Sequence, residues 1–438
     1  MKCIEDEIPF ELPEGWAWCR LNSIVDVRDG THDTPTYVDK GIPLITSKNL
    51  VEGGIDYSNV KYISEKDAIS INDRSGVNIG DILFAMIGTI GNPSMVTEDI
   101  LISIKNVALF KFTFSKNLSN HFVMYFLDYA QEDMKNKPSG GLQPFVSLNF
   151  LRTYLVPVPP VEEQQRIVSI LADSINKIRN IDVLKNELTA SVKKAKSKIL
   201  DLAIRGKLVP QDPNDEPASV LLERIRVEKE ELIKQGKIKR DKKESIIFRG
   251  DDNSYYEKIG DDIENIDTEI PFNLPDNWIW CRGCSCFSGM ETTKPQGEFF
   301  DYIDIDSIDN RLHCIKKTKR IPVIEAPSRA SRAINSGSVL FSLVRPYLEN
   351  IALIEEIHSH SIASTGFYVC NSNGLLLPDY MFYLMISKYV VDGLNQYMKG
   401  DNSPSISRND IENWLYPIPP IDEQRRIANS GSSDHTFR

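Results

Sequence analysis

The sequence predicts a mixed α/β (α+β) protein that contains two copies of one domain joined by long, coiled-coil-like helices. Three observations predict this architecture: an internal repeat, strand-like segments followed by aromatic-rich helical segments in each copy, and a long stretch between the copies with apolar residues every three or four positions. The length of 438 residues and the hydrophobic content of 41% leave room for two to three domains with sizeable cores.

Two motifs mark the ends of each copy. The lead-in motif at residues 7–20 (EIPFELPEGWAWCR) returns at 269–282 (EIPFNLPDNWIWCR), and ten of its fourteen positions are identical. We expect it to be extended and to pack its two tryptophans against the domain that follows. The exit motif at 157–167 (PVPPVEEQQRI) returns at 417–427 (PIPPIDEQRRI). It predicts the start of a helix, because Pro-Pro cannot continue a strand and acidic residues in the first turn complement the helix dipole.

Each copy also carries the pattern of a mixed domain. Residues 80–87 and 337–344 begin with the related blocks GDILF and GSVLF and predict strands. Residues 121–134 and 379–398 are rich in aromatic side chains and predict helices. The sequence between the repeated blocks differs strongly between the copies, which favours one scaffold carrying two different binding surfaces.

The stretch from Val161 to Arg205 predicts one long helix, and its 45 residues would span roughly 65 Å at 1.5 Å per residue. This is close to two turns of B-DNA, taking about 34 Å per turn. Gly206 and Pro210 are expected to end the helix, and a second, charged helix is expected at 218–235. So long a helix needs a partner to bury its apolar stripe, and both a dimerisation rod and a spacer between two binding domains stay open. The stripe consists of Leu171, Ile175, Ile178, Ile181, Leu184, Leu188, Val192, Ala195, Ile199 and Leu202.

These features divide the chain into four parts. The predicted parts are a first domain at 1–158, a helical spacer at 159–250, a second domain at 251–416 that opens with an acidic linker at 251–268, and the start of a further helix at 417–438.

The net charge of −11 is distributed unevenly. Residues 311–345 hold eight basic residues and one acidic residue, which gives +7, whereas residues 251–270 hold eight acidic residues and one basic residue, which gives −7. Screening limits the reach of each charge to about 10 Å, so local charge decides whether phosphate groups bind. The basic segment therefore allows a nucleic-acid partner, and a solvated lysine-rich surface is the alternative.

Other features argue against several classes of protein. The first residues are acidic, unlike a signal peptide, and no run approaches the roughly 18 apolar residues of a membrane span, so we expect a cytoplasmic protein. Seven irregularly spaced cysteines favour reduced thiols over a disulfide framework. The cluster at 281–286 suggests zinc, but Cys281 is the counterpart of Cys19, where no cluster exists. We therefore expect buried cysteines and no metal site.

Together the motifs resemble the specificity subunits of type I restriction–modification systems over nearly the whole chain. The resemblance rests on the repeated lead-in pattern LPxxWxW, the repeated exit pattern PxPPx[ED]EQxRI, the stretch GKLVPQDP at 206–213 and the stretch DGTHDTP at 29–35. It implies a non-catalytic subunit with two target-recognition domains. Each would recognise one half of an interrupted site in double-stranded DNA, and antiparallel helices would set the gap.

The resemblance also implies protein partners that carry the chemistry. Modification subunits would use S-adenosylmethionine to methylate adenine, and a restriction subunit would use ATP and Mg²⁺ to move and cut DNA, so we expect no cofactor in this chain. The sequence agrees, because it has no GxxxxGK[ST] loop and no Asn-Pro-Pro-aromatic motif. The nearest approach to the second is Asn92-Pro93-Ser94-Met95.

One feature departs from the family pattern. The helix that begins with the second exit motif stops within two residues of Ile427, so most of the helix expected to pair with the central one is missing. We expect a truncated C-terminal conserved helix. Homodimerisation through the unpaired central helix would be one remedy, and an inactive truncated product is the alternative.

In the first copy, the candidate DNA-binding residues are polar and basic side chains beside glycine turns. Glycine allows close approach of the backbone, and Asn or Gln can pair with adenine through two hydrogen bonds. Turn residues without a binding role are the alternative, and His32 has no cluster of partners that would make it a metal ligand or a general base. The candidates are Arg28, Thr31, His32, Thr34, Tyr37, Ser47, Lys48, Asn49, Lys137, Ser139 and Gln143.

In the second copy, basic residues dominate the candidates. Arginine can bind guanine or phosphate through two hydrogen bonds, whereas lysines contact phosphate and position the protein without specifying a sequence. Residues 402–405 are expected to take the place of residues 140–145 of the first copy, and surface salt bridges are the alternative role for the arginines. The candidates are Lys294, Lys316, Lys317, Lys319, Arg329, Arg332, Arg345, Tyr347, Ser403 and Ser405.

Two other classes of function stay open. A nuclease–methylase fusion would need the motifs that are absent. A non-DNA scaffold, or a dimerising two-domain adaptor, would use the same repeated domains to hold proteins together.

Overall fold

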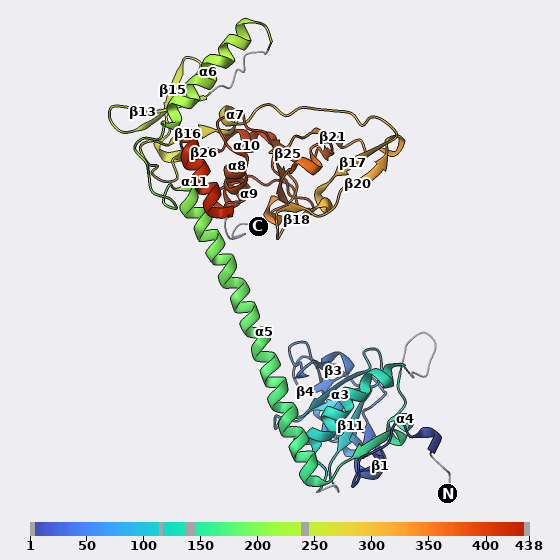
Figure 1. Ribbon diagram of the computed structural model, residues 1–438. Coiled ribbons are helices and arrows are strands. Elements are labelled where there is room, and N and C mark those ends of the chain that lie inside the picture. The colour runs from blue at the N-terminus through green and yellow to red at the C-terminus, as the bar shows by residue number, and fades with distance from the viewer. Residues whose placement is uncertain (1–4, 114–116, 137–144, 238–244, 433–438) are drawn as a thin grey trace. The chain divides into compact units, whose positions relative to one another are not determined.

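The computed structural model describes residues 5–113, 117–136, 145–237 and 245–432 (Figure 1). The chain forms two compact units, residues 1–185 and residues 186–438, and each contains one copy of the repeat. Both units mix helices and strands, which confirms the predicted fold class.

The first unit is built around a four-stranded sheet with the order β2-β11-β8-β9. Alternate residues of β8 point to opposite faces, so Ile82 and Phe84 lie in one core and Leu83 and Ala85 in another. The helix α3 (Asn120–Asn136) covers the first core, and a second sheet with the order β10-β4-β7-β3 contributes to the other. The other elements are β1 (Ala17–Arg20), α1 (Leu21–Ile24), β2 (Asp26–Asp29), β3 (Tyr37–Val38), β4 (Ile42–Ile45), β5 (Leu50–Val51), β6 (Gly54–Ile55), β7 (Lys61–Ile63), α2 (Glu65–Ser75), β8 (Ile82–Ala85), β9 (Gly91–Met95), β10 (Ser103–Ile104), β11 (Val107–Lys111), α4 (Leu148–Thr153) and β12 (Leu155–Val158).

The second unit repeats this plan. In β22, Val339 and Phe341 lie in one core with residues of the helices α8 and α9, and Leu340 lies in the opposite core with Ile303 and Ala363. Its sheets have the orders β23-β22-β25 and β20-β17-β24-β21. The elements of this copy are β16 (Ile279–Arg282), α7 (Gly283–Cys286), β17 (Phe299–Ile303), β18 (Ile308–Asp309), β19 (Cys314–Ile315), β20 (Lys319–Pro322), β21 (Ala330–Ala333), β22 (Val339–Ser342), β23 (Ile351–Leu353), β24 (Ile362–Ser364), β25 (Phe367–Cys370), α8 (Pro378–Met385), α9 (Lys388–Asn395), α10 (Arg408–Asn413), β26 (Leu415–Ile418) and α11 (Ile421–Ser432).

The prediction of a single helix at 379–398 was wrong, because this segment forms two helices, α8 and α9. Ser387 separates α8 from α9, and its hydroxyl oxygen accepts a hydrogen bond from the backbone N–H of Val390 at 3.3 Å. Serine at this position starts a new helix by satisfying an N–H group that has no partner inside the helix.

In each copy, the strand of the lead-in motif pairs with the strand at the start of the exit motif. Strand β1 runs antiparallel to β12, and β16 runs antiparallel to β26 in the same register. The indole N–H of Trp16 donates to Glu163 at 3.1 Å, and that of Trp278 donates to Glu423 at 2.8 Å. The repeated motifs therefore join the two ends of each domain.

This junction is more enclosed in the second copy. Trp278 and Glu423 are buried, whereas Trp16 and Glu163 are partly exposed. In the second copy, the side-chain amide of Gln211 also donates to Glu423. Burial raises the pKa of the Glu423 carboxyl, against the opposing effect of the hydrogen bonds from Trp278 and Gln211.

The exit motifs begin helices, as predicted. The first motif begins α5 (Val161–Ile204), and the second begins α11 (Ile421–Ser432), which continues beyond the expected end within two residues of Ile427. The charged helix α6 between the copies runs from Ala218 to Lys234. Gly206 ends α5 in the left-handed conformation, with φ +65°, and the N–H of Lys207 bonds to the carbonyl of Leu202 at 2.9 Å. A Cβ atom at Gly206 would also lie 2.4 Å from Pro275, so this position requires glycine on two counts.

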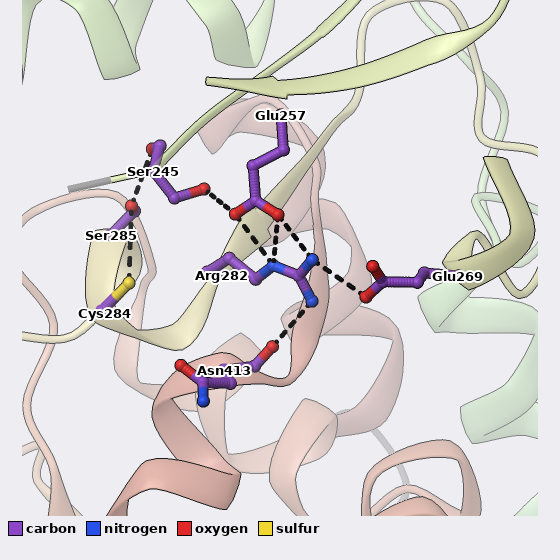
Figure 2. Close-up of polar contacts among 7 residues, drawn as sticks. All are labelled: Ser245, Glu257, Glu269, Arg282, Cys284, Ser285 and Asn413. Carbon is purple, nitrogen blue, oxygen red and sulfur yellow. Dashed lines mark hydrogen bonds and ion pairs between the residues drawn. The ribbon is translucent and has the colours of Figure 1, made fainter. Parts of the chain in front are cut away.

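The segment predicted as an acidic linker is folded. Strands β13 (Ser245–Arg249), β14 (Tyr255–Ile259) and β15 (Asp262–Asn265) form an antiparallel sheet before the second lead-in motif. Figure 2 shows how Arg282 of that motif bonds Glu257 of β14 through two nitrogens. The same arginine bonds Glu269 and the carbonyl of Asn413, and Ser245 bonds Glu257. This network attaches the added sheet to the second copy.

Candidate nucleic-acid interface

Three of the candidates in the first copy meet at the turn between β10 and β11. Lys105 and Asn106 form this turn, and Asn106 has a φ of +56°. Thr31 forms a backbone bridge with Lys105, and the hydroxyl of Thr34 accepts a hydrogen bond from Lys105 Nζ at 2.5 Å. The hydroxyl of Ser47 donates to the carbonyl of Asn106 at 3.4 Å. The structure thus brings together residues from three segments that are separate in sequence.

His32 lies at the same turn, with both ring nitrogens facing oxygen atoms. Nδ1 is 2.9 Å from Asn106 Oδ1, and Nε2 is 2.9 Å from Asp29 Oδ2. The hydrogen bonds with Asn106 and Asp29 raise the pKa of His32, against the opposing effects of burial and of Arg74. A pocket of about 150 Å³ beside the ring is also lined by Phe145. A protonated His32 adds positive charge at this turn.

One candidate of the first copy is buried and bonded within the domain. Asn49 is buried, and its side-chain oxygen accepts hydrogen bonds from Thr46 while its amide donates to the carbonyl of Asp56 at 3.1 Å. The burial of Asn49 and these hydrogen bonds argue against a contact with DNA, because its hydrogen-bonding groups hold a turn together. The sequence did not reveal this role, since a capping asparagine and a base-contacting asparagine have the same flanking turn residues.

The remaining candidates of the first copy have varied surroundings. Arg28 pairs with Asp26 at 2.7 Å, so its guanidinium is held along its own strand. Tyr37 is exposed, with Lys61 Nζ 4.4 Å from the centre of its ring. Lys48 is exposed. The candidates Lys137, Ser139 and Gln143 lie outside the described residues.

In the second copy, the structure brings Arg345 and the segment 402–405 together. The backbone N–H of Arg345 donates to the carbonyl of Pro404 at 2.8 Å, and its Nη2 donates to the carbonyl of Asn402 at 3.0 Å. Tyr347 and Ser403 are exposed beside this contact. Four candidates from two distant parts of the sequence, with Ser405 the fourth, thus form one surface.

Equivalent backbone bridges place this surface at the same corner in both copies. Ile87 bridges Phe145 in the first copy, and Val344 bridges Ser405 in the second. The strand that precedes each bridge, β8 or β22, begins with the repeated GDILF or GSVLF block. The two copies therefore present different side chains on the same backbone corner.

The other candidates of the second copy lie on or beside the sheet β20-β17-β24-β21. Lys319 of β20 pairs with Asp304, and the neighbouring Arg320, which is not a candidate, lies over the ring of Phe299. Arg332 of β21 forms a backbone bridge with Thr292, and its buried Nε has no hydrogen-bond partner among the described residues. The remaining candidates here are exposed, namely Lys294, Lys316, Lys317 and Arg329.

Sequence analysis missed several residues at these surfaces. Lys105, Asn106 and Arg74 surround His32 and Asp29, and Arg74 Nη2 lies 3.6 Å from Asp29. Asparagine is enriched in the left-handed conformation that Asn106 adopts, so this residue carried a turn signal. Nothing in the sequence placed Arg74 near residue 29.

Three cysteines of the second copy are buried, namely Cys281, Cys286 and Cys370, whereas Cys284 is partly exposed and Cys314 is exposed. Burial raises the pKa of Cys281 to about 12 and that of Cys286 well above its ordinary value. Across the ranges that the structure describes, no group of three or more His, Cys, Asp or Glu residues is arranged to hold a metal ion. No helix within those ranges is both long and apolar enough to cross a membrane.

Comparison with known proteins gives a consistent result. Residues 13–190 match the family described as "Type I restriction modification DNA specificity domain". The EcoAI specificity subunit of Escherichia coli is 27% identical over 97% of this chain and 78% of its own length. The EcoEI specificity subunit of the same species is 25% identical over 79% of this chain and 64% of its own length.

Part of the chain is also similar in sequence to a solved structure. The HsdS subunit from Thermoanaerobacter tengcongensis is 38% identical over 37% of this chain and 43% of its own, with a TM-score of 0.35. The chain thus aligns with most of the EcoAI subunit, somewhat under two thirds of the EcoEI subunit and less than half of this solved chain. Residues 13–190 thus match a type I restriction modification DNA specificity domain, and nearly the whole chain, with its repeated lead-in and exit motifs, is similar to a specificity subunit of a type I restriction enzyme.

Proposed function

We propose that this chain recognises a bipartite site in double-stranded DNA, with each copy of the repeated domain contacting one half. The observation that carries the proposal is one backbone corner presented twice with different polar and basic side chains. In the first copy His32 lies beside this corner, where it lines a pocket with Ile87 and Phe145, and in the second copy Arg345 and Ser403 occupy it. Two unlike surfaces on one scaffold suit two unlike half-sites.

The chemistry of the complex belongs to its partners in this proposal. Modification subunits bind S-adenosylmethionine and methylate adenine, and a restriction subunit binds ATP and Mg²⁺. This chain supplies recognition and binds none of these cofactors. The complex acts in the cytoplasm, where the DNA of the cell is accessible.

The central helix α5 supports a further proposal about assembly. Ile178, Leu184 and Leu188 on its apolar stripe are 59%, 63% and 66% exposed in the structure of this chain. A stripe of this spacing requires a partner helix. We propose a second copy of this chain as the partner, with the stripes of the two α5 helices packed together. Sedimentation should then give a dimer, and Leu184→Glu with Leu188→Glu should give a monomer; a monomeric wild-type chain would refute this arrangement.

The main test is genome-wide adenine methylation in cells that express this chain with the modification subunit of its own system. Matched cells lack only this chain. A new methylated motif of two short half-sites separated by a fixed gap is the expected result, and deleting seven residues within 175–192 should change the gap. A palindromic motif would indicate that one copy acts twice in a dimer. No new methylation, with the chain expressed and bound to the modification subunit, would refute the proposal.

The salt dependence of DNA binding distinguishes the proposed function from that of a non-DNA scaffold. Binding that releases counterions from DNA phosphates weakens steeply as the salt concentration rises. A scaffold would bind the modification subunit without this salt-dependent affinity for DNA.

A further inference from the structure

Arg345 has a backbone conformation that its sequence disfavours for two reasons. Its φ of +48° and ψ of +55° lie in the left-handed region, where the Cβ atom of an L-residue is crowded. It also precedes Pro346, and the proline ring disfavours helical conformations of the residue before it. A turn of three residues, Pro346–Leu348, follows, and Glu349 after it is again left-handed, with φ +56°.

The first copy has left-handed residues at both corresponding positions, in a turn that otherwise differs from that of the second copy. Gly88 occupies the position of Arg345, the third residue after the equivalent strand, and it has a φ of +77°. Asn92 follows four residues later with φ +49°, as Glu349 follows Arg345. Glycine has no Cβ atom and asparagine tolerates this region better than most residues. The scaffold therefore needs a left-handed residue here, and the second copy fills the position with arginine.

The contacts of Arg345 do not explain why arginine stands there. The hydrogen bond from its backbone N–H to Pro404 is available to any residue except proline. Among the described residues, its exposed side chain makes one hydrogen bond, from Nη2 to the carbonyl of Asn402 at 3.0 Å. No ion pair of this side chain occurs among the described residues. A strained residue whose side chain contributes little to the fold indicates a function for that side chain.

We propose that Arg345 is the specificity-determining residue of the second copy and recognises a guanine, and that the first copy has no counterpart because Gly88 presents only backbone. The inference rests on the proposed DNA-recognition function. A phosphate contact needs only an exposed cation, which Lys316 and Lys317 supply without strain. The contact with Asn402 fixes the direction of the guanidinium, and pairing with the O6 and N7 atoms of guanine requires such a fixed direction.

The test uses the full chain in complex with its modification subunit and a pool of DNA duplexes with a randomised central segment. The bound fraction is sequenced for the wild type and for Arg345→Gly, Arg345→Lys and Glu349→Asn. For Arg345→Gly, we expect one guanine of the second half-site to lose its preference and affinity for the wild-type site to fall about 10- to 100-fold. Arg345→Lys should lose the same preference, because lysine lacks the planar pair of donors. The first half-site should be unchanged in both.

Glu349→Asn is the matched control, since it relieves the same backbone conformation with the residue that the first copy uses. It should keep the wild-type site. Urea unfolding of the second unit within the full chain gives the second measurement. The urea midpoint of Arg345→Gly should equal or exceed that of the wild type. An unchanged site pattern in Arg345→Gly, or retention of the guanine preference by Arg345→Lys, would overturn the proposal. A lowered midpoint would show that the arginine supports the fold and would also overturn it. A wild-type complex that selects no site would instead refute the proposed function itself.

Discussion

The buried ion pair of the first copy offers a quantitative test of how the repeated scaffold is held together. Lys111 Nζ lies 2.8 Å from Asp81 Oδ2, and both side chains are 6% exposed. Asp81 also accepts a hydrogen bond from the backbone of Asn78 at 2.9 Å. Replacing Asp81 by serine would leave the ammonium group of Lys111 buried without a counter-charge. Loss of one partner from such a pair costs about 3–5 kcal/mol.

The second copy supplies the control, because it places a neutral pair at the same positions. Ser338 accepts the equivalent backbone hydrogen bond from Asn335 at 3.0 Å, and its hydroxyl donates to Asn371 at 2.5 Å. The adjacent strand residues pair in the same way in the two copies. The double variant Asp81→Ser with Lys111→Asn should therefore recover at least about 2 kcal/mol relative to the sum of the two single variants.

The assay is hydrogen–deuterium exchange in increasing urea, followed by mass spectrometry of peptides from β8 and β22. Peptides from β8 report the stability of the first unit. Peptides from β22 are the internal control, and their exchange should be the same in all variants. Additive losses in the double variant would refute the reasoning, because they would show that the two charges do not stabilise each other.

Three further outcomes follow from the structure. Because the pKa of His32 is raised on folding, its contribution to stability is present below its unfolded pKa and is lost as the pH rises through its folded pKa; His32→Asn should remove this part of the pH dependence of unfolding. Trp278→Phe should destabilise the second unit by about 1–3 kcal/mol, because the buried carboxyl group of Glu423 loses a hydrogen-bond donor. Trp16→Phe should destabilise the first unit by less, because Trp16 and Glu163 are partly exposed; thermal unfolding measures both effects. Asn49→Ala should lower stability without changing the selected DNA site, and a changed site would restore Asn49 as a contact.

Much of this architecture could be predicted because it depends on local or repeated patterns. The repeat, the strands at 80–87 and 337–344 and the long helix from Val161 are encoded by short-range apolar spacing and by turn residues, so the structure confirms them. The break at Ser387 was missed because a serine inside an aromatic-rich stretch has the same local signal whether it caps a helix or lies within one.

The sequence by itself determined that one scaffold occurs twice and which family the chain resembles. Only the tertiary structure decided which polar side chains share a surface. Asn49 and Arg345 look alike in sequence as polar residues in turns, yet one is buried in a capping network and the other is exposed in a strained turn. The physical reason is that burial and side-chain direction depend on contacts between segments far apart in sequence, such as Arg345 with Pro404 and Asn402, and local composition carries no record of these contacts.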